Sequence, residues 1–216
     1  LRRWSGPMSK RIGVVGAGIA GLATAVGLQR RGHDVTVVEQ RTDTSSGAGI
    51  SIWPNALAAL DRLGLGDEVR AAGGRITAGA ARWYDGSWLR RPAAERMVRA
   101  LGEPLVVVQR SLLRDILTDT LTAGSLHYGL AATDVTMAGD GVALQLSDDT
   151  VRTFDAVVGA DGIHSVLARH LNGPLRRRYV GYTAWRGIAA YALDPGLAGE
   201  TMGPGIETGH VPMGPD

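Results

Sequence analysis

The sequence predicts a mixed α/β protein in which a β-α-β unit is interleaved with antiparallel sheet. Three observations support this prediction. A strand-like, a helix-like and a second strand-like segment follow one another between residues 11 and 40. Short apolar stretches alternate with turns between residues 132 and 154. The glycine-rich stretch VVGAGIAG near the start resembles a second stretch, VVGADGIHS, much later in the chain. This mixture indicates a nucleotide-binding domain with sheet-rich segments threaded into it.

The first unit runs from Arg11 to Gln40. RIGVV is typical of a short buried strand, LATAVGLQRR of a helix with one apolar face, and DVTVVE of a second buried strand. Gly32 is suited to end the helix. Because β-α-β crossovers are right-handed, the two strands should be parallel, as in a Rossmann-like domain.

The middle of the chain predicts a helix, a hairpin, a strand and another helix. One helix should begin near Pro54, with Leu57, Leu60 and Leu63 on one face and Gly64 at its end. Residues 76–91 resemble a hairpin that turns at Asp85-Gly86. The strand LVVV then precedes the helix SLLRDILTDTL, whose apolar stripe comprises Leu112, Leu113, Ile116, Leu117 and Leu121.

The later part predicts a three-stranded meander over residues 132–154. The strand AVVGAD then leads into the second glycine turn, and RYVGYTAWRGIAAYAL is aromatic and strand-like. Residues 1–9 show no periodic pattern, so we expect a disordered leader there.

Composition excludes several classes of function. The chain has 216 residues, a net charge of +2 and no cysteine, so disulfides and thiolate chemistry are ruled out. Near-neutral charge indicates no nucleic-acid partner, and the histidines lack metal-ligand spacing. No apolar run approaches the roughly 18 residues of a membrane span. We therefore expect a cytoplasmic protein without a metal or a membrane span.

The stretch GAGIAG carries the first chemical signal. Gly16 permits a tight turn, Gly18 lets the backbone approach a pyrophosphate, and Gly21 lets helix and strand pack closely. Ala17, Ile19 and Ala20 complete the loop, and the helix start favours phosphate. Glu39, at the end of the next strand, suits the hydroxyls of an adenosine ribose and disfavours a 2′-phosphate. The loop alone fits FAD or NAD.

Four segments in this order resemble the FAD-dependent aromatic hydroxylases, single-component flavoprotein monooxygenases of the para-hydroxybenzoate hydroxylase fold. They are VVGAGIAGLATAVGLQRRGHDVTVVEQ, GAGISIWPNALAALDRLGL, QRSLLRDIL and GADGIHSVLAR. The resemblance implies a GR2-type Rossmann-like FAD-binding domain with an antiparallel substrate domain. It also implies NAD(P)H as co-substrate, and hydroxylation of a small aromatic substrate through a C4a-hydroperoxyflavin.

The resemblance carries further residues over to this chain. It places Asp161 near the FAD pyrophosphate, so that both glycine turns would serve one cofactor, although an aspartate there also suits a helix cap. It directs Arg110 toward the flavin side of the cofactor; the alternative is an arginine on the surface with no ligand. It places Ser51 near FAD; the alternative is a loop serine that makes a local turn bond. Arg186 is the candidate to hold a phenolate or carboxylate of the substrate, or else an edge arginine. No catalytic acid or base can be assigned.

We expect residues 10–75 and 105–170 to form the FAD-binding domain, and residues 76–104 and 171–216 to be segments of a truncated substrate domain. The family's third signature, a Gly-Asp-Ala-Ala-His type segment, is absent from the sequence. One alternative is therefore a non-catalytic dinucleotide-binding fragment that pairs with a complementary C-terminal chain and holds FAD weakly alone. An NAD-dependent dehydrogenase is disfavoured, because no hydride-transfer residue stands out.

Overall fold

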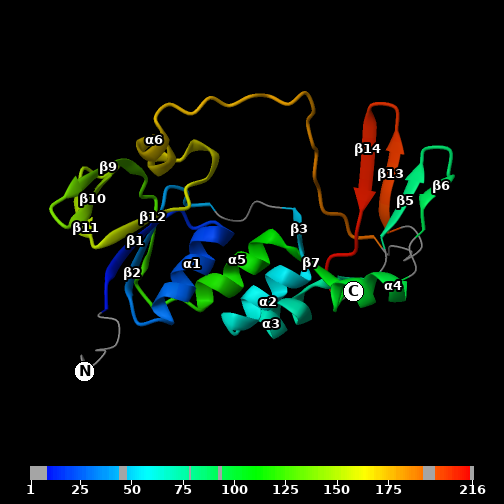
Figure 1. The fold of residues 1–216 in the computed structure, drawn as a ribbon, viewed down its shortest axis with the longest axis horizontal. Helices are drawn as coiled ribbons and strands as arrows, with labels where there is room; N and C mark the ends of the chain where they lie inside the picture. Colours follow the sequence, from blue (N-terminus) through cyan, green and yellow to red (C-terminus); the bar gives the residue numbers. More distant parts are fainter. Residues whose placement is uncertain (1–8, 44–47, 78, 92–93, 192–197, 215–216) are drawn as a thin grey trace, which may run out of the picture. The chain divides into compact units, whose positions relative to one another are not determined.

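The computed structural model describes residues 9–43, 48–77, 79–91, 94–191 and 198–214. The chain divides into two compact units, and each unit is built from two stretches of sequence (Figure 1). The first unit comprises Leu1–Ser45 and Leu117–Thr183, and the second comprises Ser46–Ile116 and Ala184–Asp216. The expected leader falls on residues 1–8, outside the described ranges, and on residue 9.

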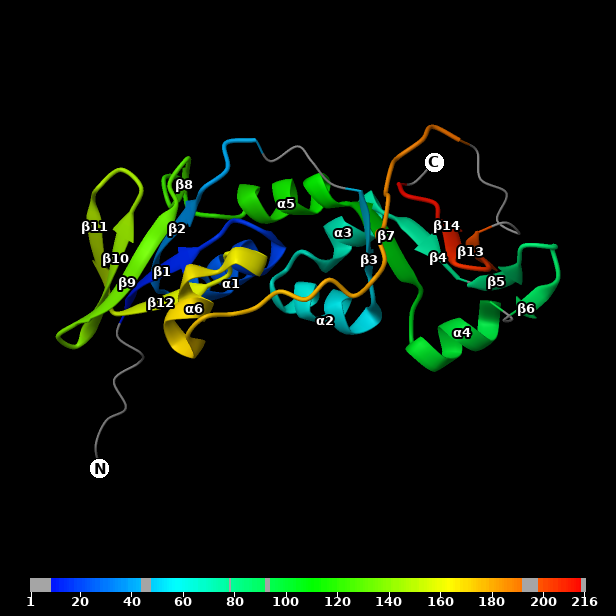
Figure 2. The same ribbon diagram turned by 90° about the horizontal axis from the view of Figure 1, so that it is seen from above.

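A parallel sheet forms the centre of the first unit. Its order is β12-β1-β2-β8, from Ala156–Gly159, Arg11–Val15, Asp34–Glu39 and Leu126–Tyr128 (Figure 2). Helix α1, Ile19–Gln29, connects β1 to β2, which pair in parallel from Arg11 with Asp34 to Val15 with Val38. After α1, Gly32 adopts a positive φ of 82°, as a glycine does beyond a helix end. The predicted β-α-β unit is confirmed.

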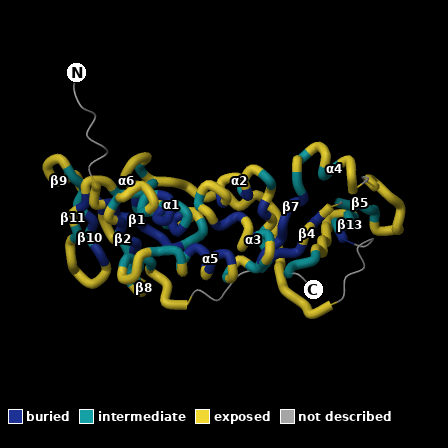
Figure 3. Tube along the Cα trace, turned by 90° about the horizontal axis from the view of Figure 1, so that it is seen from below, coloured by how far each residue is buried: buried dark blue, intermediate teal, exposed yellow. Residues whose placement is uncertain are grey.

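The predicted meander is also confirmed, as an antiparallel sheet of order β11-β10-β9. Its strands are Ala132–Ala138 (β9), Gly141–Leu146 (β10) and Val151–Phe154 (β11). After β12, a short 3-10 turn, Gly162–His164, leads into α6, Val166–Asn172. Both sheets and α6 contribute to one buried apolar cluster (Figure 3): Val15, Val38, Val135, Leu144, Leu146, Phe154 and Leu167. The meander therefore packs against the parallel sheet by burying apolar surface.

The second unit contains two sheets and paired helices. Strand β7, Leu105–Gln109, lies between β3, Gly49–Ile52, and β4, Gly74–Ile76, and is antiparallel to both. The second sheet has the order β14-β13-β5-β6, from Ile206–His210, Gly199–Gly203, Ala80–Trp83 and Trp88–Arg90. The helices are Pro54–Arg62 (α2), Gly66–Ala72 (α3), Ala94–Leu101 (α4) and Arg110–Asp119 (α5), which continues into the first unit.

The hairpin and the two helices predicted for this region are confirmed. Between β5 and β6, the Gly86 N–H donates to the Trp83 carbonyl at 2.9 Å, and Gly86 has a φ of 87°. Helix α2 begins at Pro54 and buries Leu57 and Leu60. In α5 the apolar stripe holds for Leu113, Ile116 and Leu117, but Leu112 is 38% exposed, so its place in the stripe was wrong.

The strand expected from RYVGYTAWRGIAAYAL does not form in the described part of that stretch. Residues 174–191 have no helix or strand, and residues 192–193 lie outside the description. Strand propensity needs a neighbouring strand to supply hydrogen-bond partners, and none pairs with this segment in the described ranges. Because this segment has no strand partner, its large apolar side chains are more than half exposed: Leu175, Tyr179, Val180, Tyr182, Trp185, Ile188 and Tyr191.

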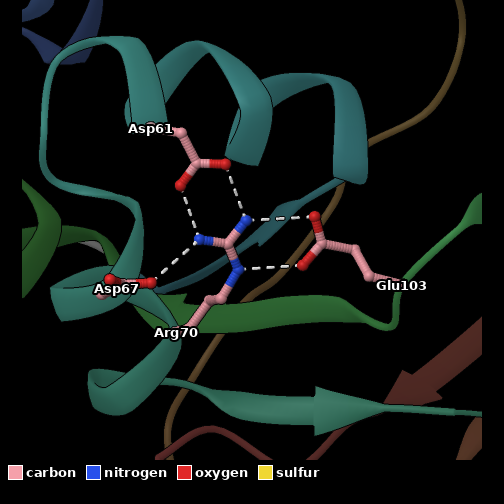
Figure 4. A network of polar contacts seen from close by, with 4 residues as sticks. All are labelled: Asp61, Asp67, Arg70 and Glu103. Carbon is pink, nitrogen blue, oxygen red and sulfur yellow. Dashed lines mark hydrogen bonds and ion pairs between the residues drawn. The ribbon is translucent and has the colours of Figure 1, made fainter.

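An ion-pair network ties α2 and α3 to the chain before β7 (Figure 4). The Arg70 guanidinium donates to both carboxylate oxygens of Asp61, at 2.6 and 2.9 Å, and to both of Glu103, at 2.8 and 3.1 Å. Asp67 lies 3.6 Å from the same guanidinium. A Cβ at Gly66 would collide with Asp61 and would lie 2.6 Å from Arg70 Nη1, so the network requires glycine there.

Replacing Arg70 with methionine should lower the melting temperature by about 2–4 °C, since bidentate pairs within a network reach the upper end for partly exposed ion pairs. Hydrogen bonds from Arg70 lower the pKa of Asp61 and of Glu103. Their stabilisation is therefore complete above the ordinary carboxyl pKa of about 4 and disappears as the pH falls below it.

Thermal melts of the parent chain and Arg70→Met between pH 7 and pH 3 check this expectation. The difference between the two proteins should shrink below about pH 4. Arg96→Met, on the exposed side of α4, serves as the matched control. A difference that persists at pH 3 would show that the Arg70 side chain stabilises through packing instead.

Candidate functional site

The glycine loop lies between β1 and α1, where the parallel sheet meets the first helix. The Gly16 N–H donates to the Val38 carbonyl at 2.8 Å, which holds the start of the loop on β2. Gly18 precedes α1 in an extended conformation and supplies no side-chain cap, and the first turn contains no acidic residue. Since the first N–H groups of a helix have no acceptor within it, this helix start favours an anion.

The three glycines of the loop have different surroundings. Gly16 has a φ of 101°, and a Cβ there would collide with the Ala160 carbonyl oxygen. At Gly21 a Cβ would collide with the Gly16 carbonyl oxygen and lie 3.3 Å from the Ala160 Cβ. A Cβ at Gly18 would meet nothing within 4 Å. Gly16 and Gly21 are therefore required by packing, whereas Gly18 leaves an open approach to the backbone.

Glu39 lies beside the loop, at the last position of β2. Its Oε2 accepts a hydrogen bond from the Ala17 N–H at 2.7 Å, and its Oε1 accepts one from the Arg41 N–H at 2.8 Å. The carboxylate is half-buried. The structure thus brings Glu39 to the loop, as its place at the end of the second strand predicts, and the ribose contact itself stays a prediction.

The second glycine turn lies against the first. The Ala160 N–H donates to the Val15 carbonyl at 2.8 Å, so the residue before Asp161 is held at the end of β1. Asp161 accepts hydrogen bonds from the Ser165 hydroxyl at 2.6 Å and from the Val166 N–H at 2.7 Å. Ser165 in turn accepts one from the Ala168 N–H at 2.8 Å. Asp161 therefore supports the start of α6, and its contact with a cofactor remains a prediction.

Ser51 and Arg110 lie in the second unit, on strand β3 and at the start of α5. Ser51 is exposed on β3 and pairs with Val107 of β7. Arg110 follows β7 directly, is exposed, and donates its N–H to the Ala48 carbonyl at 3.2 Å. These two residues belong to the second unit, whereas Gly16 to Gly21, Glu39 and Asp161 are gathered in the first unit. That all of these residues contact one FAD molecule stays a prediction.

Arg186 lies in the exposed segment 174–191 rather than on the expected sheet. Its substrate role was argued from a strand that the described chain does not form, so the structural basis for that role was wrong. Sequence reasoning also missed Ala160, which contacts Gly16 and approaches Gly21. The available signal was its small side chain directly before the second acidic glycine turn.

Within the described ranges, no cluster of three or more His, Cys, Asp or Glu side chains is placed to hold a metal ion. In those same ranges, every helix falls short of the length and apolar character that crossing a bilayer requires.

The fold and the loop define a dinucleotide-binding protein, and the comparisons identify its class. A family described as "FAD binding domain" matches residues 10–195. The 3-amino-4-hydroxybenzoate 2-monooxygenase of Streptomyces platensis is 42% identical over 190 residues, covering 87% of this chain and 48% of the relative. The 6-hydroxynicotinate 3-monooxygenase of Bordetella bronchiseptica is 35% identical over 189 residues, covering 86% of this chain and 49% of the relative.

A solved structure agrees with these relatives. Klebsiella pneumoniae HpxO complexed with FAD and uric acid has a TM-score of 0.73 and 29% identity, and the match covers 84% of this chain and 46% of that one. The chain belongs to the FAD-binding flavoprotein monooxygenase family of aromatic hydroxylases. It spans about half the length of the curated relatives that it matches. The predicted family and the predicted α/β class with a Rossmann-like FAD-binding domain are confirmed.

Proposed function

We propose that the chain is the FAD-binding part of a monooxygenase that uses NAD(P)H and O2 to hydroxylate a small aromatic substrate. One observation carries the proposal. The start of α1 has no side-chain cap, the space next to Gly18 is open, and the Glu39 carboxylate accepts from the neighbouring Ala17 N–H. This arrangement fits a dinucleotide that carries a pyrophosphate and a free ribose. The likeness to monooxygenases over most of the chain supports the choice of FAD over NAD.

Each residue of the site has a proposed task. The N–H groups of Ile19, Ala20 and Gly21 would hold the pyrophosphate together with the helix dipole, because the N-cap residue Gly18 has no side chain that could accept from them. Glu39 would accept from the ribose hydroxyls through its remaining lone pairs. Ser51, Arg110 and Asp161 would contact other parts of the cofactor. Bound FAD would accept a hydride from NAD(P)H and activate O2, and the protein would supply position and shelter from water.

The relatives support a proposal for the substrate class. Their names describe enzymes that act on 3-amino-4-hydroxybenzoate, on 6-hydroxynicotinate and, for a Klebsiella pneumoniae enzyme, on urate. We propose a hydroxylated aromatic or heteroaromatic compound for this chain. Arg186 would pair with its phenolate or carboxylate, as a permanent cation with a planar donor fork can.

A visible absorption spectrum of the purified chain, followed by titration with FAD, tests the cofactor. We expect the absorption of bound flavin. NADH and NADPH oxidation should then be measured with hydroxybenzoates, hydroxynicotinates and urate, with product analysis. Hydroxylated product equal to the nicotinamide consumed is the expected result. A protein that does not bind FAD would contradict the cofactor assignment, whereas oxidation without product in a flavin-loaded, full-length protein would contradict the hydroxylase assignment.

A second candidate is a non-catalytic FAD-binding fragment that acts with a complementary polypeptide. The apolar side chains exposed along residues 174–191 favour it, because large exposed apolar patches mark surfaces that another polypeptide covers. In that case this chain alone would hold FAD weakly. Intact mass after affinity purification separates the two candidates: a second polypeptide together with flavin supports the split arrangement, whereas tight, stoichiometric FAD on this chain alone contradicts it.

A further inference from the structure

Glu39 joins two backbone segments through a single carboxylate. Oε2 accepts from the Ala17 N–H, inside the glycine loop, and Oε1 accepts from the Arg41 N–H, two residues beyond Glu39 itself. Ala17 is buried, and its neighbours in the loop are Gly16 and Gly18. The carboxylate therefore connects the middle of the loop to the chain that leaves β2.

A loop with glycine on both sides of Ala17 needs such a connection. Glycine loses more conformational freedom on folding than any other residue, so a glycine-rich loop is costly to hold in one conformation. Hydrogen bonds to a carboxylate are about twice as strong as bonds between neutral groups. On its other side the loop meets the backbone of Ala160, and this contact restricts Gly16. The Glu39 bond adds a directional restraint to the middle of the loop, where Ala17 is buried.

We propose that Glu39 is a positioning residue that holds the glycine loop in its binding conformation before any cofactor arrives. The proposal rests on the proposed FAD-binding function for its ligand, but its geometry belongs to the chain without cofactor. A carboxylate has about four acceptor positions, and the two observed bonds leave lone pairs for ribose hydroxyls. Glu39 therefore serves both roles together, and the restraint lowers the ordering cost of binding.

Hydrogen exchange on the FAD-free chain tests the proposal. Glu39→Met keeps the length of the side chain and removes both acceptors. The amide of Ala17 should then exchange roughly tenfold faster, since a hydrogen bond to a charged group is lost. Glu39→Gln retains one acceptor oxygen and should give a smaller acceleration. Glu207→Met, at an exposed position of β14, is the matched control and should leave the Ala17 exchange unchanged.

Two results would overturn the proposal. Unchanged exchange at Ala17 in Glu39→Met, even with weaker FAD binding, would make Glu39 a ribose ligand only. Equal acceleration at Ala17 and at the core amides of Val14 and Val37 would assign Glu39 a general role in stability. A chain that binds no FAD while Ala17 alone exchanges faster would sustain the positioning role and contradict the proposed function, so the two failures are distinguishable.

Discussion

Gly21→Ala is expected to lower the free energy of unfolding by about 3 kcal/mol, although alanine is the better helix former by up to about 1 kcal/mol. The added Cβ would collide with the Gly16 carbonyl oxygen and press on the Ala160 Cβ at 3.3 Å. Both contacts are with parts of the first unit that cannot rotate away as a long side chain could. The collision therefore outweighs the gain in helix propensity.

Urea unfolding followed by circular dichroism measures this effect. Gly18→Ala is the matched control, because a Cβ there meets nothing within 4 Å and its backbone is extended. The control should unfold within about 1 kcal/mol of the parent chain, the usual difference between glycine and alanine at a helix N-cap. If Gly21→Ala were as stable as the control, the close packing of Gly21 against the Gly16 carbonyl would be refuted.

Gly18→Val should separate binding from folding. A Cβ at Gly18 meets nothing within 4 Å in the folded chain, so the melting temperature should change by no more than a few degrees. FAD affinity should nevertheless fall by about 10–100-fold, because the side chain would occupy the approach of the pyrophosphate to the loop backbone. Flavin fluorescence titration gives the affinity. Equal affinity in the variant would show that the phosphates do not pass over Gly18.

Local patterns predicted those elements whose partners are close in sequence. β1, α1 and β2 follow from a glycine loop between two apolar strands, and the hairpin follows from Asp85-Gly86. The strand expected beyond Arg178 was wrong, because its aromatic residues have strand propensity but no adjacent strand in the described chain. β3 and α3 were missed because a strand of four residues and a helix of seven residues leave weak periodic signals.

In the site, too, contacts that are local in sequence could be predicted and long-range contacts could not. The loop and Glu39 could be predicted because the spacing of glycines and carboxylate follows from one β-α-β unit. The bond from Ala17 to Glu39 and the contact of Ala160 with Gly16 could not, since they depend on side-chain rotamers and on a strand far along the chain. The resemblance to a family supplied Ser51, Arg110 and Asp161, and their contacts with a cofactor await measurement.

The place of β12 in the parallel sheet has a consequence for how the protein is made. β1 pairs with β2, which follows soon after it, but also with β12, which the ribosome delivers more than a hundred residues later. The nascent chain can form β1, α1 and β2 early, yet Gly16 acquires its neighbour Ala160 only after almost the whole first unit has been synthesised. Closing such a long stretch of chain is slow compared with local pairing. The glycine loop therefore reaches its final form late in folding, although it lies near the start of the sequence.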